Sequence, residues 1–169
     1  MKSLFLAALI LLLGFTASCA KIDYDHVFIS RVIDGDTLEL ANGQRVRLIG
    51  IDTPEMYKSK KLYRDAQRSK QDLQTIQELG QRSYNFTKKL AEGKLARLEF
   101  DVEKRDVYGR VLAYVFIKSD DSEEIFLNAE IIKQGYASLM TFPPNVKYVD
   151  LFRKLYQEAR EDKRGLWRE

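Results

Sequence analysis

The stretch TLELANGQRVRLIGI, residues 37–51, predicts a β-hairpin and points to the fold class. Leucines alternate with polar residues before the Asn42-Gly43 dipeptide, and Val46 and Leu48 alternate with arginines after it. Asn-Gly is a strong signal for a tight turn, because both residues tolerate a positive φ. We therefore expect two paired antiparallel strands, each with one buried face.

Three further segments have the composition of strands, and helical patterns lie between and after them. The strand segments are HVFISRVI (26–33), LARLEFDV (95–102) and RVLAYVFI (110–117). Apolar residues at helical spacing predict helices that stop near Gly93, Gly135 and Gly165, and Asn128 is expected to be the N-cap of the second. The pattern indicates an α+β fold with about three α-helices. A five-stranded OB-fold β-barrel would bury it, although the spacing alone also permits other α+β sheets.

Length and composition are those of one compact domain. The chain has 169 residues, of which 45% are hydrophobic and 31% are charged, and its formal net charge of +3 is too small to identify a partner. Basic residues gather in MYKSKKLYRDAQRSK, residues 56–70. This basic segment either attracts polyanions or is simply solvated charge on a loop. It is part of the longer stretch between Glu55 and Gly80, which we expect to be an expanded basic loop with a helical turn around DLQTIQEL.

The N-terminus has a different pattern from the rest of the chain. A lysine, the apolar run SLFLAALILLLGF and the small-residue cluster TASCA predict an export signal, because the run is shorter than the roughly 20 apolar residues of a membrane-spanning helix. We expect a signal peptide at 1–18, a tether at 19–26 and the folded domain at 27–169. Cys19, the only cysteine, favours lipidation and therefore an exported, membrane-anchored envelope lipoprotein. Ordinary secretion with cleavage after Ala20 is the alternative.

Two aspartates interrupt the strand pattern of RVIDGDTLEL, residues 31–40. Asp34 and Asp36 flank Gly35, and aspartate is a poor strand residue, so a tight turn is one explanation. Pairing across the hairpin would also bring Asp36 next to Asp52 of the motif RLIGIDTPE. Converging carboxylates repel each other unless a cation bridges them, and oxygen ligands suit Ca²⁺ or Mg²⁺ better than zinc. A pair of polar turns at a barrel rim is the alternative.

Two arginines and a glutamate add a second kind of chemistry. Arg47 lies in the third predicted strand, Arg110 begins the fifth, and Glu55 follows Asp52 closely in the sequence. Guanidinium groups beside a hard cation neutralise charge that builds on phosphate oxygens, and a carboxylate can direct a water molecule. Each arginine alone is more often a surface ion-pair partner, but the combination indicates phosphodiester hydrolysis.

Five motifs, in the same order, make the chain resemble the thermonuclease (staphylococcal nuclease-like) family. They are VIDGDTLEL, RLIGIDTPE, DVYGRVLAYVF, LNAEIIKQGYA and the terminal GLW, and the match extends from about Val27 to Trp167. The resemblance implies an OB-fold barrel with three helices and a Ca²⁺-dependent endonuclease that cleaves DNA and RNA and leaves 3′-phosphates. It implies no protein partner, and a monomer is expected.

The resemblance also implies a set of cation ligands. Asp36 and Asp52 would give side-chain oxygens to one Ca²⁺ ion, in preference to Mg²⁺, and Thr53 would give its backbone carbonyl. Asp34 would support this set from behind without touching the ion.

The catalytic roles are likewise implied by the resemblance. Arg47 and Arg110 would grip the scissile phosphate, and Arg110 would also assist the leaving oxygen. Glu55 would orient or deprotonate the attacking water, and Tyr108 would hydrogen-bond a phosphate in the substrate groove.

The chain departs from the family in its contacts to substrate. Val107 stands where the family often has a lysine, and Phe142 is the aromatic residue near the position of a tyrosine pair that flanks a bound base. Because stacking contributes about 1–3 kcal/mol per base, the grip on substrate is expected to be weaker or differently placed. We expect basic residues of the 56–70 segment to replace part of it by following the phosphate backbone: Lys58, Lys60, Lys61, Arg64 and Arg68.

Two other functions fit part of the pattern. A binding module of the Tudor-nuclease type keeps the fold but loses catalytic acids and arginines, all of which are present here. An envelope lipoprotein whose barrel binds an oligosaccharide or a protein is the second. An exported metal-dependent nuclease fits the whole pattern.

Overall fold

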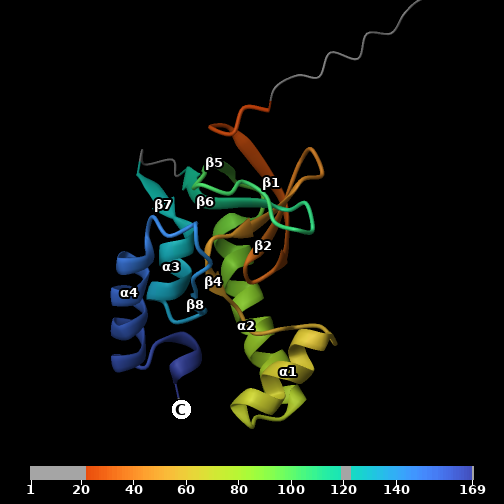
Figure 1. The fold of residues 1–169 in the computed structure, drawn as a ribbon, viewed down its shortest axis with the longest axis vertical. Coiled ribbons are helices and arrows are strands. Elements are labelled where there is room, and N and C mark those ends of the chain that lie inside the picture. Colours follow the sequence, from red (N-terminus) through yellow and green to blue (C-terminus); the bar gives the residue numbers. More distant parts are fainter. Residues whose placement is uncertain (1–21, 119–122, 169) are drawn as a thin grey trace, which may run out of the picture.

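The computed structural model describes residues 22–118 and 123–168, and its central feature is a closed barrel (Figure 1). Antiparallel ladders join the strands in the order β3-β2-β1-β5-β6, and parallel pairing of β3 with β6 closes the barrel. The barrel strands are β1 (Val27–Asp34), β2 (Thr37–Leu40), β3 (Arg45–Leu48), β5 (Leu95–Glu99) and β6 (Val111–Lys118). The predicted α+β, OB-like fold is confirmed. The predicted signal peptide and Cys19 lie outside the described residues.

Among the residues that the structure describes, three short strands lie outside the barrel. Strand β4 (Gly50–Asp52) pairs with β8 (Ser138–Met140), and β7 (Glu124–Phe126) extends the sheet beside β6. The β4–β8 pairing places Asp52 opposite Ser138. The strand that contains Asp52 therefore pairs with the strand that precedes Phe142.

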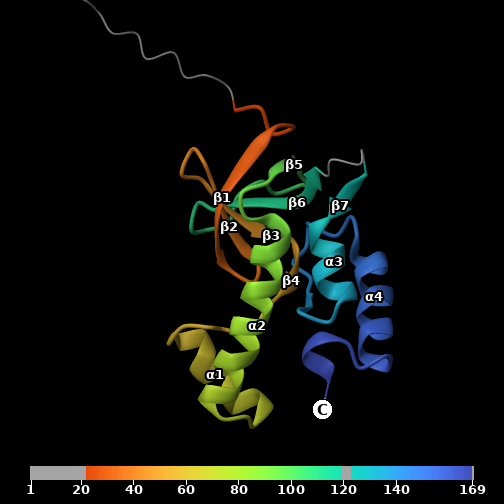
Figure 2. The same cartoon turned by 180° about the vertical axis from the view of Figure 1, so that it is seen from behind.

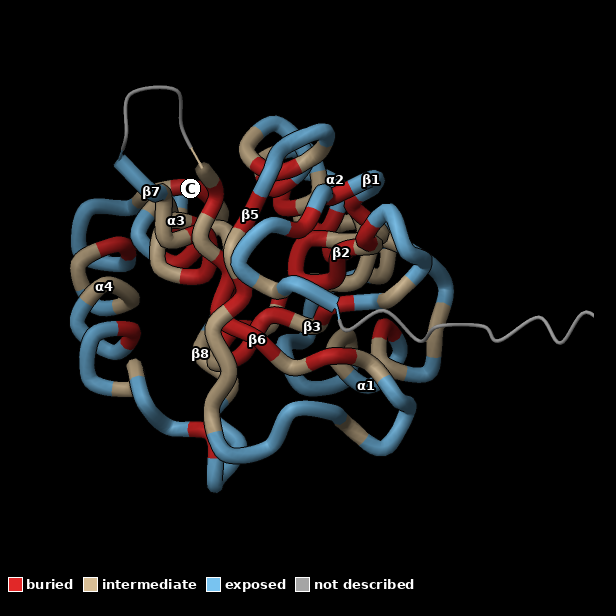
Figure 3. Tube along the Cα trace, turned by 90° about the horizontal axis from the view of Figure 1, so that it is seen from above, coloured by how far each residue is buried: buried red, intermediate tan, exposed pale blue. Residues whose placement is uncertain are grey.

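The predicted hairpin forms as β2 and β3. Leu38 pairs with Val46 and Thr37 with Arg47, and Gly43 adopts the positive φ of 80° that the tight turn requires. Apolar side chains of both strands enter the barrel, where Leu38 and Val46 are fully buried. Figure 3 shows buried residues along the barrel strands and exposed residues in the connections.

The described part of the chain has four α-helices, one more than expected: α1 (Lys60–Ser69), α2 (Leu73–Ala91), α3 (Leu127–Lys133) and α4 (Val149–Glu161). Helices α3 and α4 pack together on one side, and α1 lies beside the first half of α2 on the other (Figures 1 and 2). No helix in the described parts of the chain is long and apolar enough to cross a membrane.

Helix α1 and the first half of α2 replace the loop predicted between Glu55 and Gly80. That prediction is wrong, apart from the helical turn expected around DLQTIQEL, which lies in α2. Ser59 caps the helix, because its Oγ accepts a hydrogen bond of 3.1 Å from the backbone N–H of Leu62. Leu62 is fully buried and is the one buried side chain of the helix. A buried apolar side chain and a side-chain cap therefore help to order this strongly basic segment next to α2.

Asn128 has a different role from the predicted N-cap. Helix α3 begins after Phe126, without a side-chain cap, and Asn128 is completely buried. Its Oδ1 accepts a hydrogen bond from Val115 N–H at 3.0 Å, and its Nδ2 donates to the carbonyl of Ile49 at 2.9 Å. The amide thus joins α3 to β6 and to the turn between β3 and β4.

We expect Asn128→Ala to lower the free energy of unfolding by about 2–4 kcal/mol, because it leaves buried backbone groups without partners. Urea denaturation measures this loss. Asn85→Ala is the matched control, since Asn85 is an exposed residue of α2. A loss in Asn128→Ala no larger than that in Asn85→Ala would show that the buried amide is unimportant for stability.

Candidate active site

A cavity of about 710 Å³ lies beside the rim of the barrel and collects most of the predicted site residues. Those among its lining residues are Asp34, Asp36, Arg47, Asp52, Thr53, Glu55, Lys61, Tyr108, Arg110 and Phe142. They come from β1 to β4, the start of α1, and the segments around β6 and β8. Lys58 and Lys60 are exposed and are not among the residues that line the cavity.

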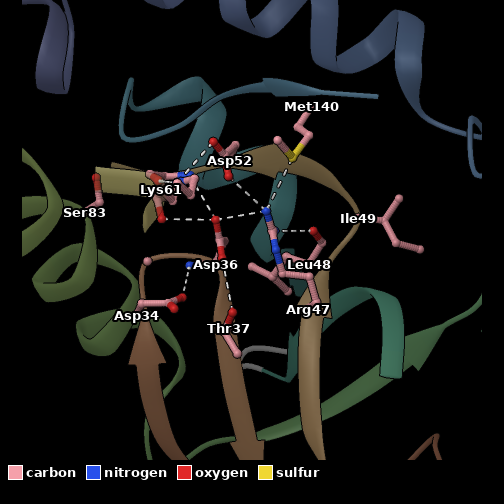
Figure 4. Close-up of polar contacts among 12 residues, drawn as sticks. Asp34, Asp36, Thr37, Arg47, Leu48, Ile49, Asp52, Lys61, Ser83 and Met140 are labelled. Carbon is pink, nitrogen blue, oxygen red and sulfur yellow. Dashed lines mark hydrogen bonds and ion pairs between the residues drawn. The ribbon is translucent and has the colours of Figure 1, made fainter. Parts of the chain in front are cut away.

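Arg47 bridges the two predicted cation ligands (Figure 4). Its Nη2 lies 3.1 Å from Asp36 Oδ2 and 3.2 Å from Asp52 Oδ1, and its Nη1 donates to the Leu48 carbonyl at 2.8 Å. Asp36 Oδ2 also accepts hydrogen bonds from the backbone N–H and the hydroxyl of Thr53, at 2.9 and 3.1 Å. Burial alone would raise the pKa of Asp36, but Arg47 and the Thr53 N–H hold it below its ordinary value.

Asp34 and Asp36 have different roles: Asp34 stabilises a turn, and Asp36 contacts Arg47 and Thr53. Asp34 Oδ1 accepts a hydrogen bond of 3.1 Å from the Asp36 N–H, which fixes the turn around Gly35. A Cβ at Gly35 would lie 2.7 Å from Thr53 Oγ1, so the turn packs closely against the next segment of the site. Burial and the neighbouring Asp36 charge raise the pKa of Asp34 to about 7.

Lys61 lies among the carboxylates of Asp52, Glu55 and Asp65, which we call the acidic cluster. We expected it to face a nucleic-acid backbone. Its Nζ donates to the Thr53 carbonyl at 2.8 Å and lies 3.3 Å from both Asp52 Oδ2 and Glu55 Oε1. Asp65, one turn further along α1, is 3.6 Å away. Burial would lower the pKa of Lys61, but these carboxylates raise it above its ordinary value, so the group is an ammonium at neutral pH.

Glu55 is held from two directions. Ser59 Oγ donates to its Oε2 at 3.1 Å, which adds to the Lys61 contact on Oε1. From the other side, α2 approaches so closely that a Cβ at Gly80 would lie 2.6 Å from the Glu55 carbonyl carbon. Gln77 Nε2 also donates to the Met56 carbonyl at 3.0 Å. Helix α1 therefore sets the surroundings of the carboxylate, and α2 sets the position of its backbone.

The close approach at Gly80 leads to a second prediction. We expect Gly80→Ala to lower kcat by about 10–100-fold and the free energy of unfolding by about 1–3 kcal/mol, because the added methyl displaces Glu55. Cleavage kinetics and urea denaturation measure the two effects. Gln81→Ala, an exposed change one residue later in α2, is the control. An alanine variant that gains stability, as the helix propensity alone predicts, would show that the approach is not tight.

Arg110 is ordered by the turn that precedes β6. Its Nε donates to Asp106 Oδ2 at 2.7 Å, and Asp106 Oδ1 accepts the backbone N–H groups of Tyr108 and Arg110 at 3.0 and 2.9 Å. The guanidinium carbon lies 5.6 Å from the centre of the Tyr108 ring. Tyr108 and Phe142 are 82% and 69% exposed, which leaves these aromatic faces available at the cavity mouth.

The donor set at the cavity fits a hard cation. Asp36 and Asp52 offer carboxylate oxygens and Thr53 a backbone carbonyl, and the Lys61 ammonium already contacts two of these groups. Among the residues that the structure describes, no group of three or more His, Cys, Asp and Glu side chains is arranged around a metal position. A cation here would therefore rest on two carboxylates, one carbonyl and water.

Two residues that line the cavity, Tyr57 and Arg105, were not predicted from the sequence, whereas Arg64 was expected to contact substrate. Tyr57 is 61% exposed, and Arg64 of α1 and Arg105 also line the cavity. Arg105 donates to the Gly109 carbonyl at 2.8 Å and so supports the turn before Arg110. An aromatic residue among the lysines of the 56–70 segment was the available signal for Tyr57.

A closed OB-like barrel with arginines and carboxylates around one rim cavity is an arrangement that can bind a phosphodiester and cleave it. The family model described as "Staphylococcal nuclease homologue" matches residues 45–169, and the chain belongs to this family of metal-dependent enzymes. The protein is therefore a nuclease, that is, a hydrolase.

Relatives with known names agree with this assignment. The chain is 35% identical over 156 residues to a thermonuclease of Staphylococcus intermedius, covering 90% of this chain and 82% of that protein. A thermonuclease of Staphylococcus hyicus is 33% identical over 140 residues, with coverage of 81% and 72%. Endonuclease YncB of Bacillus subtilis (strain 168) is 34% identical over 146 residues, but that match covers 84% of this chain and only 61% of the endonuclease.

Proposed function

We propose that this protein is a Ca²⁺-dependent endonuclease that hydrolyses DNA and RNA and leaves 3′-phosphate ends. One observation carries the proposal: Arg47, Arg110 and Glu55 line the same cavity as the paired Asp36 and Asp52. The similarity to proteins named thermonuclease and endonuclease supports it.

The residues of the cavity have complementary tasks in this reaction. Arg110 and Arg47 bind the oxygens of the scissile phosphate, since a planar guanidinium can hold two oxygens at once. Glu55 accepts a hydrogen bond from the attacking water, orients it and takes its proton. Asp36, Asp52 and Thr53 would hold the cation, which supplies positive charge next to the phosphate when it is bound.

The cavity mouth is suited to the rest of the nucleic acid. Tyr57, Tyr108 and Phe142 are exposed there, and base–aromatic stacking tolerates any sequence. Lys58 and Lys60 are exposed, just before α1 and at its first residue, and add positive charge that attracts phosphates. We infer substrate contacts from this combination of rings and charge, with the protein acting as a monomer.

The test is incubation of the full chain with supercoiled plasmid and with RNA, in Ca²⁺, in Mg²⁺ and in excess chelator. We expect cleavage in Ca²⁺ that stops with chelator, and fragments that a DNA polymerase extends only after phosphatase treatment, because a 3′-phosphate blocks extension. Retained DNA binding without cleavage in any cation would identify a binding module. Fragments that are extended directly would contradict the proposed product.

We also propose that the protein is exported and anchored to the cell envelope through lipid on Cys19, on the basis of the N-terminal sequence pattern. Cys19→Ala is expected to move the protein from the membrane fraction to the soluble fraction of cells, which immunoblotting of the fractions measures. Ser18→Ala is a neighbouring control. An unchanged distribution in Cys19→Ala would favour ordinary secretion.

A further inference from the structure

The Lys61 ammonium competes for oxygens that the proposed cation needs. Its Nζ lies 2.8 Å from the Thr53 carbonyl oxygen and 3.3 Å from Asp52 Oδ2, which are two of the three groups in the proposed ligand set. Two cations this close repel strongly, because charges about 4 Å apart interact appreciably even in a partly solvated site. The ammonium and a divalent cation therefore exclude each other from these oxygens.

The start of α1 is built to deliver this side chain. Leu62, the next residue, is fully buried, so the backbone at residue 61 is fixed against α2. Ser59 caps the helix and also donates to Glu55 Oε2, which brings the helix start and the acidic cluster into one hydrogen-bonded unit. This packing fixes where the Lys61 side chain starts, so Lys61 differs from a lysine on a mobile surface loop.

Lys61 also has a place to go when it is displaced. Its side chain is 21% exposed, so solvent reaches it, and Asp65 lies one helical turn away on α1, with 3.6 Å between Nζ and Oδ2. Glutamate or aspartate four residues from a lysine pairs favourably along a helix surface. The ammonium can leave Thr53 and Asp52 by a change of rotamer while α1 keeps its position.

We propose that Lys61 is an internal competitor that sets the divalent-cation affinity of this nuclease. This inference rests on the cation dependence of the proposed function. When the ammonium contacts these oxygens, their charge is balanced without a metal ion. The apparent affinity for Ca²⁺ is then the intrinsic affinity multiplied by the fraction of molecules in which Lys61 has moved away from the oxygens. Asp36 keeps its hydrogen bonds from the backbone N–H and the hydroxyl of Thr53 in either state, so one carboxylate remains in place throughout.

Calcium binding to the full-length protein, without nucleic acid, tests the proposal by titration calorimetry. We expect Lys61→Met to bind Ca²⁺ about 10–100-fold more tightly than the wild type, because charge-assisted contacts of this kind no longer have to be broken. Lys61→Arg keeps a competing cation and is expected to remain close to the wild type. Lys154→Met, an exposed change of the same kind on α4, controls for the loss of one positive charge.

Thermal unfolding gives a second readout that does not depend on cleavage. In chelator, Lys61→Met is expected to melt below the wild type, because Asp52 and Glu55 lose their shared cation. In saturating Ca²⁺, the increase in melting temperature is expected to be larger for Lys61→Met than for the wild type.

The outcomes separate this inference from the proposed function. Equal or weaker Ca²⁺ binding by Lys61→Met, in a protein whose wild type cleaves plasmid in Ca²⁺, would overturn the competition and leave the function standing. A wild type that neither binds Ca²⁺ nor cleaves DNA with it would contradict the proposed function, and the competition with it. Tighter binding by both Lys61→Met and Lys154→Met would reduce the effect to net charge and also overturn the proposal.

Discussion

Replacing Glu55 with glutamine is expected to lower kcat for DNA cleavage by about 10²–10⁴-fold, the usual contribution of a positioned general base. Glutamine has the same shape, so Ser59 Oγ can still donate to a side-chain oxygen, but the amide cannot take a proton from water. The Lys61 contact on Oε1 loses its opposite charge while the Asp52 contact remains. We therefore expect the variant to fold, to bind DNA and to cleave slowly.

Single-turnover cleavage of a labelled oligonucleotide in saturating Ca²⁺ measures this loss, and circular dichroism checks the fold. Glu78→Gln, an exposed change on α2, is the control and is expected to have wild-type kinetics. A Glu55→Gln enzyme with kcat close to that of the wild type would exclude Glu55 as the group that activates water, and Asp34 or Asp52 would then need the same test.

Replacing Arg110 with alanine is expected to lower kcat/KM by about 10²–10³-fold, which is the loss typical of one preorganised donor to a developing negative charge. The guanidinium is held by Asp106 at 2.7 Å and lies against the Tyr108 ring, so its position is fixed before substrate arrives. Arg110→Lys keeps the charge but not the planar fork, and an intermediate loss is expected.

Arg153→Ala on α4 controls for the removal of an exposed arginine and is expected to leave cleavage unchanged. The stability cost of Arg110→Ala is small, up to about 1 kcal/mol, because the Asp106 pair is partly exposed. If Arg110→Ala and Arg110→Lys both cleaved at the wild-type rate, Arg110 would be a partner of Asp106 in the turn and not a phosphate ligand.

Local patterns predicted the barrel well. The Asn42-Gly43 turn, the alternation in β2 and β3 and the glycine at residue 135 each depend on neighbouring residues, and the structure has Gly43 and Gly135 at positive φ. The hairpin led to the prediction that Asp36 and Asp52 lie close together. Both contact Arg47 in the structure, but Asp52 belongs to β4, which pairs with β8 and not with the hairpin.

Features that depend on distant parts of the chain were not predicted. Asn128 has the residue type of an N-cap, but its partners Ile49 and Val115 come from other elements, so tertiary packing outweighs the local preference. Helix α1 was taken for a loop because it buries only Leu62, although Ser59 was a readable cap signal. Because helix α1 was not predicted, the contacts of Lys61 with Thr53 and Asp52 were not predicted either.

Different elements determine the position of the Glu55 backbone and the charges around its carboxylate. Helix α2 contacts the backbone, and residues 59 and 61 contact the carboxylate. Residues 55–56 are pinned to α2 through Gly80 and Gln77, and the chain then makes an excursion through α1 before it returns to α2 at Leu73. Substitutions in residues 57–72 can therefore exchange the positive charge beside Glu55 for another, or remove it, while the contacts of α2 with residues 55–56 keep the Glu55 backbone in place.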